Sequence, residues 1–292
     1  MNILTFDIEE WVLEKDHLGD RKERYAEYDR ILEHILELLD ANHQTATFFC
    51  LGKLASDFPH VIRKIAAHGH EIGSHSHAHK WVNKMTSEEF KEDTLTSIKS
   101  LEDLTGKKVE SFRAPAFSIG ETNKWAIEIL AECGIKNDAS IFPGVRDFGG
   151  FPSFNKQHPC KIEYNGAVIN EFPIPIYRLP IFGKELAYSG GGYFRLLPIS
   201  FVKKRINASN YNMCYFHIGD LLTEKSKMMT RKEYEDYFKE AGTLKNRCVR
   251  YLKTNIGKGK SMKNLESLLS SFNFISCEEF LKNNAIQTIV NV

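Results

Sequence analysis

Residues 45–79 read TATFFCLGKLASDFPHVIRKIAAHGHEIGSHSHAH, and this stretch contains one complete pattern of strand, helix and strand. The run TATFFCL is compact and rich in β-prone residues, which predicts a buried strand. A helix is expected to begin at Pro59 and to stop at Gly69. Its apolar residues recur at helical spacing: Val61, Ile62 and Ile65. The run EIGSHS predicts the next strand, and two strands joined by a helix in this way pair in parallel.

The same alternation extends in both directions from this unit. Upstream, apolar residues recur at helical spacing over 25–39. Downstream, Thr86 and Glu89 have the spacing of a capping box ahead of a helical stripe, and the short run ESFRAP follows that helix. Residues 125–133 predict a further helix, which Gly134 closes. Alternating strands and helices imply a parallel α/β sheet, either doubly wound or closed into a barrel, and we expect the barrel.

The second half of the chain departs from this rhythm. Residues from about 142 to 198 are rich in glycine, proline and aromatic side chains, which predicts an insertion on the barrel rather than a second domain. The run NMCYFHIGD predicts another strand, and residues from about 221 to 292 are expected to complete the fold with helices and a strand. One helix is expected where a stripe occurs: Tyr234, Phe238, Ala241, Leu244, Cys248 and Tyr251. We therefore expect residues 1–292 to form a single domain.

Composition and charge exclude several classes of protein. The 292 residues are 42% hydrophobic and 26% charged, as in an ordinary globular protein. Lys and Arg number 39 against 38 Asp and Glu, so the net charge of +1 offers no field for nucleic acid. The sequence carries no signal of oligomeric state.

The cysteines and the N-terminus predict a cytoplasmic protein. The six cysteines are scattered without a CxxC pair, which argues against a zinc ribbon and a disulfide framework. The first residues, MNILTFDIEE, lack the basic start and the long apolar run of a signal peptide. No stretch approaches the roughly 20 apolar residues of a transmembrane segment.

Histidines are densest in the run His75-Ser76-His77-Ala78-His79. A spacing of four places His75 and His79 on one face of a helical turn, where two imidazoles can share a divalent metal. An extended segment would instead align all three histidines. A surface histidine patch is the alternative without function, and the position just after a strand argues against it.

Other chemically active side chains also follow predicted strands. They are Asp7, Glu9, Glu10, Arg113, Asp138 and His217. Each has a structural alternative: a helix cap for the acids, a salt bridge for Arg113, a turn for Asp138 and a core position for His217. Their common position at strand ends favours an active site at one edge of the sheet.

Five segments resemble the polysaccharide deacetylase family, also called carbohydrate esterase family 4. They are FDIEEW, HSHAH, RAPAFS, DAS and CYFH, in the order and approximate spacing of that family, over about residues 1–220. TATFFCLG and GGGYFRLLP are similar to the subgroup found with surface-polysaccharide and exopolysaccharide assembly.

The resemblance implies a distorted (β/α) barrel with fewer than eight strands and one divalent metal, with zinc as the first choice. The metal would be held by His75, His79 and one acid. The family commonly has two adjacent aspartates, a base and a ligand, where this chain has Asp7, Ile8 and Glu9. We assign Asp7 as the base and Glu9 as the ligand, with Glu10 as the fallback.

The chemistry of amide hydrolysis fits these side chains. A metal with an open position activates a water molecule and polarises the carbonyl. Asp7 would deprotonate the water, and Arg113 would orient Asp7 and keep it charged. His217 would protonate the departing amine, with Asp138 as the group that holds its ring. A backbone N–H between Ala114 and Phe117 would stabilise the oxyanion.

Substrate contacts are expected from two segments. The first contains Ala114, Pro115 and Phe117, and the second contains Gly191 and Tyr193. The triple glycine 190–192 could admit a sugar close to the backbone, or it could form a tight buried loop.

Two further segments have simpler interpretations than their motifs suggest. GKGKS at 257–261 resembles the end of a phosphate-binding loop, but Thr254 stands where that motif needs glycine and no apolar strand precedes it. The run 245–263 contains seven Lys and Arg and no acid, and a solvated helix face is the expected role.

The residues as a set predict a metal-dependent hydrolase that removes N-acetyl groups from an amino sugar of a polysaccharide, a glycolipid or a precursor. Two alternatives remain. One is a metal-independent amidohydrolase of the same fold that acts on a small C–N substrate. The other is a non-catalytic glycan-binding protein.

Overall fold

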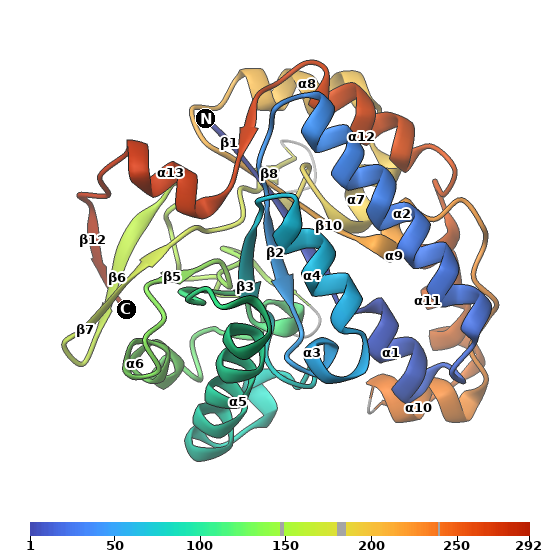
Figure 1. The fold of residues 1–292 in the computed structure, drawn as a ribbon, viewed down its shortest axis with the longest axis horizontal. Coiled ribbons are helices and arrows are strands. Elements are labelled where there is room, and N and C mark those ends of the chain that lie inside the picture. The colour runs from blue at the N-terminus through green and yellow to red at the C-terminus, as the bar shows by residue number, and fades with distance from the viewer. Residues whose placement is uncertain (147–148, 180–184, 239) are drawn as a thin grey trace.

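The structure is a computed structural model, and it describes residues 1–146, 149–179, 185–238 and 240–292 (Figure 1). Its main sheet contains ten strands. In spatial order they are β10 (Asn212–His217), β1 (Asn2–Ile8), β2 (Thr47–Cys50), β3 (Glu71–Ser74), β4 (Ser111–Phe112), β5 (Asn137–Asp138), β7 (Ala167–Glu171), β6 (Cys160–Tyr164) and β12 (Ile289–Asn291), with β11 (Phe274–Ile275) against β1. A separate pair joins β8 (Tyr177–Arg178) to β9 (Glu185–Leu186).

The run from β10 to β7 is parallel throughout, as the alternation of strands and helices predicts. This parallel run contains seven strands, which agrees with the expectation of fewer than eight strands. The whole sheet has ten strands, because β6, β11 and β12 add to the run, and it therefore exceeds that expectation. The path of paired strands ends at β10 and β12, and closure into a barrel remains a prediction. Strands from both halves of the chain share this one sheet.

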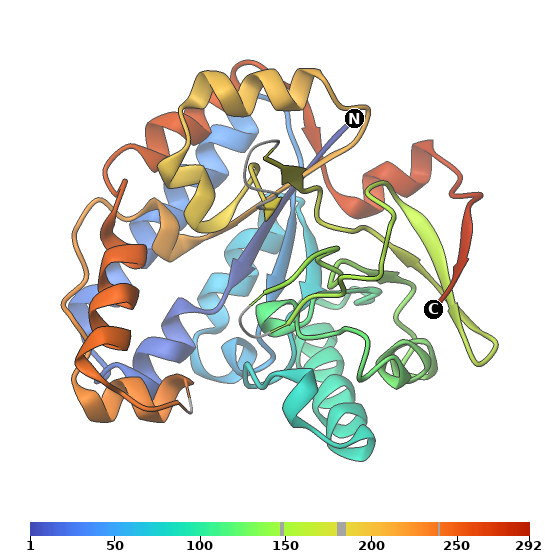
Figure 2. The same cartoon turned by 180° about the vertical axis from the view of Figure 1, so that it is seen from behind.

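Helices follow the strands along the chain. They are α1 (Glu10–His17), α2 (Lys22–Ala41), α3 (Lys53–Asp57), α4 (Pro59–Ala67), α5 (Ser87–Thr105), α6 (Trp125–Glu132), α7 (Gly191–Leu196), α8 (Ile199–Asn207), α9 (Ile218–Leu221), α10 (Arg231–Phe238), α11 (Leu244–Asn255), α12 (Ser261–Leu269) and α13 (Cys277–Asn283). The capping box predicted from Thr86 and Glu89 opens α5 with both of its hydrogen bonds. Figures 1 and 2 show the helices around the strands from the two sides.

The prediction of one continuous helix over the stripe from Tyr234 to Tyr251 is wrong. Two helices, α10 and α11, replace it. The second begins because the Thr243 side chain accepts a hydrogen bond from the Asn246 N–H and caps it. Gly242 and Thr243 therefore indicated the end of one helix and the start of the next, and the apolar periodicity alone did not show this.

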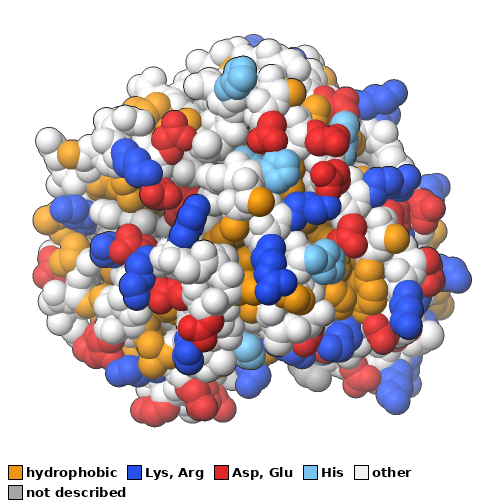
Figure 3. Space-filling model, viewed as in Figure 1, with side chains coloured by type: hydrophobic (Ala, Val, Ile, Leu, Met, Phe, Trp, Pro, Cys, Tyr) orange, Lys and Arg blue, Asp and Glu red, His pale blue; other side chains and the backbone are white. Residues whose placement is uncertain are grey.

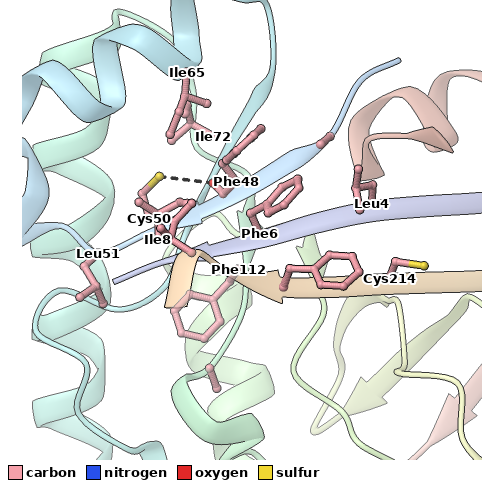
Figure 4. Packing of buried hydrophobic residues seen from close by; sticks show 14 of the residues in the cluster. Leu4, Phe6, Ile8, Phe48, Cys50, Leu51, Ile65, Ile72, Phe112 and Cys214 are labelled. Atoms are coloured by element: carbon pink, nitrogen blue, oxygen red, sulfur yellow. Dashed lines mark hydrogen bonds between the residues drawn. The ribbon is translucent and has the colours of Figure 1, made fainter. Parts of the chain in front are cut away.

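Alternation along the strands separates two apolar clusters on the two faces of the sheet. In β1, Leu4, Phe6 and Ile8 join the larger cluster, where Phe6 stacks on Phe48 at 4.9 Å between ring centroids. Figure 4 shows Leu4, Phe6 and Phe48 in this packing, together with the contact from Cys50 Sγ to Phe48 O. The opposite face of β1 carries Ile3, Thr5 and Asp7, and Ile3 belongs to the smaller cluster. Asp7 therefore lies on the face of the sheet that carries the smaller cluster, here called the inner face. His217 lies on the same face, because it alternates along β10 with Met213 and Tyr215, which belong to that cluster.

The outer surface mixes charges of both signs. Figure 3 shows acidic and basic side chains interspersed over one face of the molecule. This distribution agrees with the net charge of +1.

The insertion expected at 142–198 is described except for 147–148 and 180–184. It supplies β6 and β7 to the sheet, the pair β8–β9 and the helix α7. The part from 221 onward supplies α10 to α13 with β11 and β12.

Candidate active site

The carboxyl ends of the neighbouring parallel strands lie at one edge of the sheet. Asp7 of β1 is paired in register with His217 of β10. Ser74, Phe112 and Asp138 are aligned across β3, β4 and β5. His75 and Arg113 follow directly after these aligned positions, so register alone brings the side chains predicted from strand ends to one edge.

Three of these side chains form a cluster that could hold a metal ion. One ligand atom from each of Glu9, His75 and His79 lies within 4.8 Å of the other two. Glu9 Oε2 lies 2.8 Å from His79 Nε2 and 3.3 Å from His75 Nε2. His75 Nδ1 lies 2.8 Å from the Arg113 carbonyl oxygen, which turns Nε2 toward Glu9. A carbonyl that accepts from the other ring nitrogen is the usual way to orient a metal-binding imidazole.

The histidine segment is an irregular turn rather than the helical turn or the extended strand considered from spacing. Ser76 and His79 have φ values of +68° and +59°. The Ser76 hydroxyl accepts a hydrogen bond from the His79 N–H at 3.0 Å, which fixes the turn. His77 points away from the cluster, since its N–H bonds to Asp93 and its Nδ1 lies beside Gly52. Two of the three histidines therefore face the site.

Charge compensation stabilises the ionised form of Glu9. Burial would raise the pKa of this carboxyl, but His79, His217 and His75 together lower it well below its ordinary value. Glu9 Oε2 is buried and accepts no hydrogen bond within the described residues. A buried anionic oxygen without a donor, facing two imidazole nitrogens, is what a cation site presents.

Glu10, the fallback ligand, has a different role. Its Oε1 accepts a hydrogen bond from the Gly219 N–H at 2.5 Å, and it is outside the cluster of three. Burial and the neighbouring Glu9 raise the pKa of Glu10 to about 8. The carboxyl thus joins the start of α1 to the turn after β10.

Arg113 is fully buried and binds Asp7. Its Nη1 lies 2.8 Å from Asp7 Oδ1 and 2.8 Å from Thr5 Oγ1, and its Nε donates to the Ala139 carbonyl at 3.1 Å. The guanidinium also lies over the Phe49 ring at 4.4 Å. One side chain therefore joins the ends of β1, β4 and β5 across the inner face, and it leaves Asp7 Oδ2 for other contacts.

His217 faces both acids of the site from the other side. Its Nε2 is 3.8 Å from Asp7 Oδ2 and 3.8 Å from Glu9 Oε1. Its Nδ1 lies 3.0 Å from Asp220 Oδ2. Burial would lower the pKa of His217, but Glu9, Asp220 and Asp7 raise it well above its ordinary value. These acids therefore favour the protonated form of the ring.

Asp138 was expected to hold the His217 ring, and this expectation is wrong. β5 lies four strands from β1, whereas Asp220 lies in the turn that follows His217. Asp138 is instead paired with Glu171, and its Oδ1 accepts a hydrogen bond from the Ser140 hydroxyl. Burial raises the pKa of Asp138 to about 6 and raises that of Glu171 well above its ordinary value. Burial of the two neighbouring carboxyls therefore favours protonation of one of them.

Asp220 and Arg195 were not identified from the sequence as residues of the site. Asp220 also bonds to Arg195, with 2.5 Å between Oδ1 and Nη1. The spacing of three in HIGD, which forms a capping box with His217 at its start, was an available signal for Asp220. Arg195 comes from the triple-glycine segment, and no local pattern indicates its partner.

The expected substrate contacts lie at the site but are partly used by the protein itself. The Ala114 N–H donates to Ser140 Oγ at 2.8 Å, and the Phe117 N–H donates to the Ala114 carbonyl at 3.1 Å. Pro115 has no N–H. Ala116 and Phe117 have positive φ values of 56° and 52°, so the turn is strained at this point.

The triple glycine is packed beneath Tyr215. A Cβ on Gly190 would lie 2.3 Å from the Tyr215 carbonyl oxygen, and Gly191 is buried against the Tyr215 ring. Tyr193 is half-buried against the inner apolar cluster. This geometry favours the tight buried loop of the two alternatives.

A cleft of 380 Å³ lies between the loop after His79, the loop after Phe117 and the end of α10. Its walls include two aromatic side chains, Trp81 and Phe238. They also include polar groups: Asn83, Ser118, Glu121, Thr122 and Asn123. Aromatic rings beside hydrogen-bonding groups are a lining suited to a sugar.

The GKGKS segment does not form a phosphate-binding loop. The helix α11 precedes it where that motif needs a strand, and Gly257 and Gly259 have φ values of +80° and +90°.

Among the described residues, the longest apolar helical stretches are too short and too polar to cross a bilayer.

Comparisons with known proteins place the two halves of the chain differently. Residues 3–137 match the family model described as polysaccharide deacetylase. Residues 139–282 match a model described as a domain of unknown function, DUF3473. The predicted resemblance to polysaccharide deacetylases is thus supported for the half that carries Asp7, Glu9, His75, His79 and Arg113.

Curated relatives match a similar part of the chain. A peptidoglycan-N-acetylglucosamine deacetylase of Bacillus cereus is 35% identical over 95 residues, which are 32% of this chain and 34% of that protein. A chitooligosaccharide deacetylase of Azorhizobium caulinodans is 31% identical over 97 residues, which are 33% of this chain and 43% of that protein. The chain therefore spans well under half the length of these relatives. The subgroup linked to exopolysaccharide assembly remains a prediction.

The likeness to solved structures extends over almost the whole chain, as one of them illustrates. This example is a candidate polysaccharide deacetylase from Mycobacterium smegmatis, with a TM-score of 0.64 and 17% identity over 99% of this chain and 93% of that one. At this identity the likeness shows a shared α/β fold.

Proposed function

We propose that this chain, whose residues 3–137 match the polysaccharide deacetylase family, is a metal-dependent hydrolase that removes N-acetyl groups from an amino sugar. The substrate would be a polysaccharide, a glycolipid or a precursor of either. The observation that carries the proposal is the cluster of Glu9, His75 and His79 beside the Asp7–Arg113 ion pair.

The donor set fits a divalent cation. Two imidazole nitrogens and one carboxylate oxygen form three protein ligands and leave positions for water and substrate, as in catalytic zinc sites. Zinc is the first choice, and cobalt, nickel or manganese would also accept these donors. A bound ion would lower the pKa of a water molecule and polarise the acetamide carbonyl.

Asp7 is the proposed general base. Arg113 binds its Oδ1, which leaves Oδ2 to accept the proton of the attacking water. Arg113 is fixed by Thr5, Ala139 and the Phe49 ring, so it holds the carboxylate in one orientation. This orientation reduces the entropy cost of reaching the transition state.

His217 is the proposed general acid. Its Nε2 lies between the two acids of the site, and its Nδ1 is held by Asp220. An imidazolium held in this way can give a proton to the departing amine. The Ala116 N–H is the proposed oxyanion donor, because Ala114 and Phe117 use their N–H groups within the protein and Pro115 has none.

The cleft beside the site is the proposed position for a neighbouring sugar ring. Trp81 would stack against the ring, and Asn83 and Glu121 would bind its hydroxyls. We also propose a cytoplasmic location and a single domain over residues 1–292. The six cysteines support the location, since none of them is paired.

The test is the metal content of the purified protein together with acetate release. Wild type and His75→Ala are compared by elemental analysis, with His158→Ala as the control because His158 is exposed on a loop far along the chain. About one equivalent of metal in wild type and the control, lost in His75→Ala together with acetate release from N-acetylated oligosaccharides, is expected.

Different failures point to different alternatives. Turnover that survives complete chelation would favour the metal-independent amidohydrolase. Saccharide binding without acetate release from a broad N-acetylated panel would favour the glycan-binding protein.

A further inference from the structure

Exposed apolar side chains are concentrated around α11. Among the described residues, eleven large hydrophobic side chains are exposed, and six of them belong to α11 or to segments that contact it. These six are Leu196, Met228, Leu244, Val249, Leu252 and Ile256, here called the α11 surface. Leu244 and Leu252 are 63% and 52% exposed. A monomeric protein scatters such residues singly, so their grouping indicates a contact surface.

The members of the α11 surface are adjacent in space. Leu244, Leu252 and Ile256 are spaced by multiples of four and form a row that winds gradually around the helix, with Ile256 as the residue just beyond its end. Met228 joins this row through its sulfur, which lies 3.9 Å from Cys248 Sγ. Leu196 follows Arg195, whose backbone closely approaches Gly257 and whose Nη2 donates to the Lys253 carbonyl at 2.8 Å.

Within the α11 segment itself the charge has one sign, and acidic side chains lie on the neighbouring segments, at Glu224 and on α10. Residues 241–265 contain seven Lys and Arg and no Asp or Glu. Lys245 and Lys260 are exposed next to the apolar row, and Lys225 and Lys227 are exposed on the neighbouring segment. A helix with apolar residues flanked by basic ones is the pattern that lies in the plane of an anionic membrane surface.

We propose that the α11 surface docks on the anionic surface of a lipid bilayer. The apolar side chains would enter the boundary between headgroups and acyl chains, and the lysines would contact the anionic headgroups. A nucleic acid would use the lysines but would leave the exposed leucines and isoleucine in water. A bilayer uses both kinds of side chain, and for this reason we favour it.

The surface is linked to the active site by a short series of contacts. His217 is held by Asp220, Asp220 by Arg195, and Arg195 by the Lys253 carbonyl of α11. Helices α10 and α1 are also in contact, and α1 begins directly after Glu9. Figure 1 shows α10 and α11 beside α1. Docking would therefore bring the site close to the membrane surface, whatever reaction the site performs.

Sedimentation with lipid vesicles tests the proposal without substrate or added metal. The full chain is mixed with vesicles of phosphatidylcholine alone and with vesicles that also contain phosphatidylglycerol. Two variants change the surface: Leu252→Ser with Ile256→Ser, and Lys245→Glu with Lys260→Glu. Matched controls change exposed residues of α5 and the turn after it: Leu95→Ser, and Lys99→Glu with Lys107→Glu. Circular dichroism checks that each variant is folded.

We expect wild type and both controls to bind the anionic vesicles and to bind neutral vesicles weakly. Each surface variant should bind the anionic vesicles at least about 10-fold more weakly, because it removes apolar burial or reverses charge at the interface. Equal binding to both vesicle types, or unchanged binding by the variants, overturns the proposal. Loss of binding in the charge variant but not in the apolar variant also overturns it, since it indicates a general polyanion contact.

A second copy of the chain is the competing occupant. Sedimentation velocity of wild type at several concentrations tests for it. A dimer that Leu252→Ser with Ile256→Ser disperses would overturn the membrane proposal. Because none of these measurements involves acetate release, their failure leaves the proposed hydrolase activity to be judged separately.

Discussion

His217 and Asp220 form a hydrogen-bonded pair at the end of β10. Asp220 Oδ2 lies 3.0 Å from the ring Nδ1 of His217 and 3.2 Å from its backbone nitrogen. The carboxylate thus fixes the direction of the ring, and Arg195 holds the carboxylate in turn. The pair replaces the contact with Asp138 that the sequence suggested.

Asp220→Asn should lower kcat for acetate release by about 100-fold or more, because the ring loses the acceptor that orients it as an acid. Asp138→Asn should have little effect on kcat, since Asp138 bonds to Ser140 and the ring of His217 is held by Asp220. Steady-state kinetics of the two variants decides between them. The reverse order of effects would restore Asp138 as the partner.

Glu9→Gln should weaken metal binding by more than about 10-fold, because a neutral amide replaces the anionic ligand between the two imidazoles. Glu10→Gln should keep the metal, since the Gly219 N–H can bond to the amide oxygen equally well. Competition with a chelator, followed by elemental analysis, measures both affinities. Loss of metal in Glu10→Gln alone would assign the ligand to Glu10.

Arg113→Met should destabilise the protein by about 3–5 kcal/mol, because it leaves the buried Asp7 carboxylate without its partner. Lys99→Met is the control, since it breaks an exposed pair with Asp103 and should change stability little. Urea denaturation gives both values. Similar small losses in the two variants would show that Arg113 contributes no more than a surface pair.

We expect the protein to lose stability in acid because of the buried ring of His70. Its ring is buried against Phe48, and burial lowers its pKa to about 4, whereas the unfolded chain has a pKa near 6.5. The neutral ring is therefore favoured in the folded state. The stability that depends on this difference is present above about pH 6.5 and is lost as the pH falls toward 4.

The measurement is urea denaturation at pH 7 and at pH 4.5. His70→Leu cannot titrate, so it should lose on the order of 2 kcal/mol less than wild type between these pH values. His158→Leu, at an exposed position, should behave as wild type does. An identical pH dependence in all three proteins would contradict the assignment.

Gly190→Ala should destabilise the protein by about 1–3 kcal/mol, because the added Cβ would lie 2.3 Å from the Tyr215 carbonyl oxygen. Gly192→Ala is the matched control, since its Cβ would have only an ordinary contact of 3.5 Å with Arg195. Thermal denaturation distinguishes the two. Equal melting temperatures would show that the loop can move away from Tyr215.

The parallel fold and most of the site could be predicted from local patterns. Strand alternation, the capping box at Thr86 and the helix stop at Gly69 depend on neighbouring residues, so the sequence displays them directly. The candidate ligands His75 and His79 were visible because they belong to one short segment. Parallel register then brings the strand ends to one edge without further information.

Other features depend on contacts between distant parts of the chain. Asp7 and Arg113 are 106 residues apart, and Arg195 and Asp220 are 25 residues apart. Which buried acid meets which base follows from strand order and curvature, since a charged group in the interior is stable only beside the partner that the fold places there. The sequence by itself therefore determined the alternating strands and helices of the first half, their parallel pairing and the candidate ligands. The tertiary structure decided that Asp220 rather than Asp138 holds His217, because β5 and β10 lie on opposite sides of β1 to β4 while the turn after β10 places Asp220 against the ring.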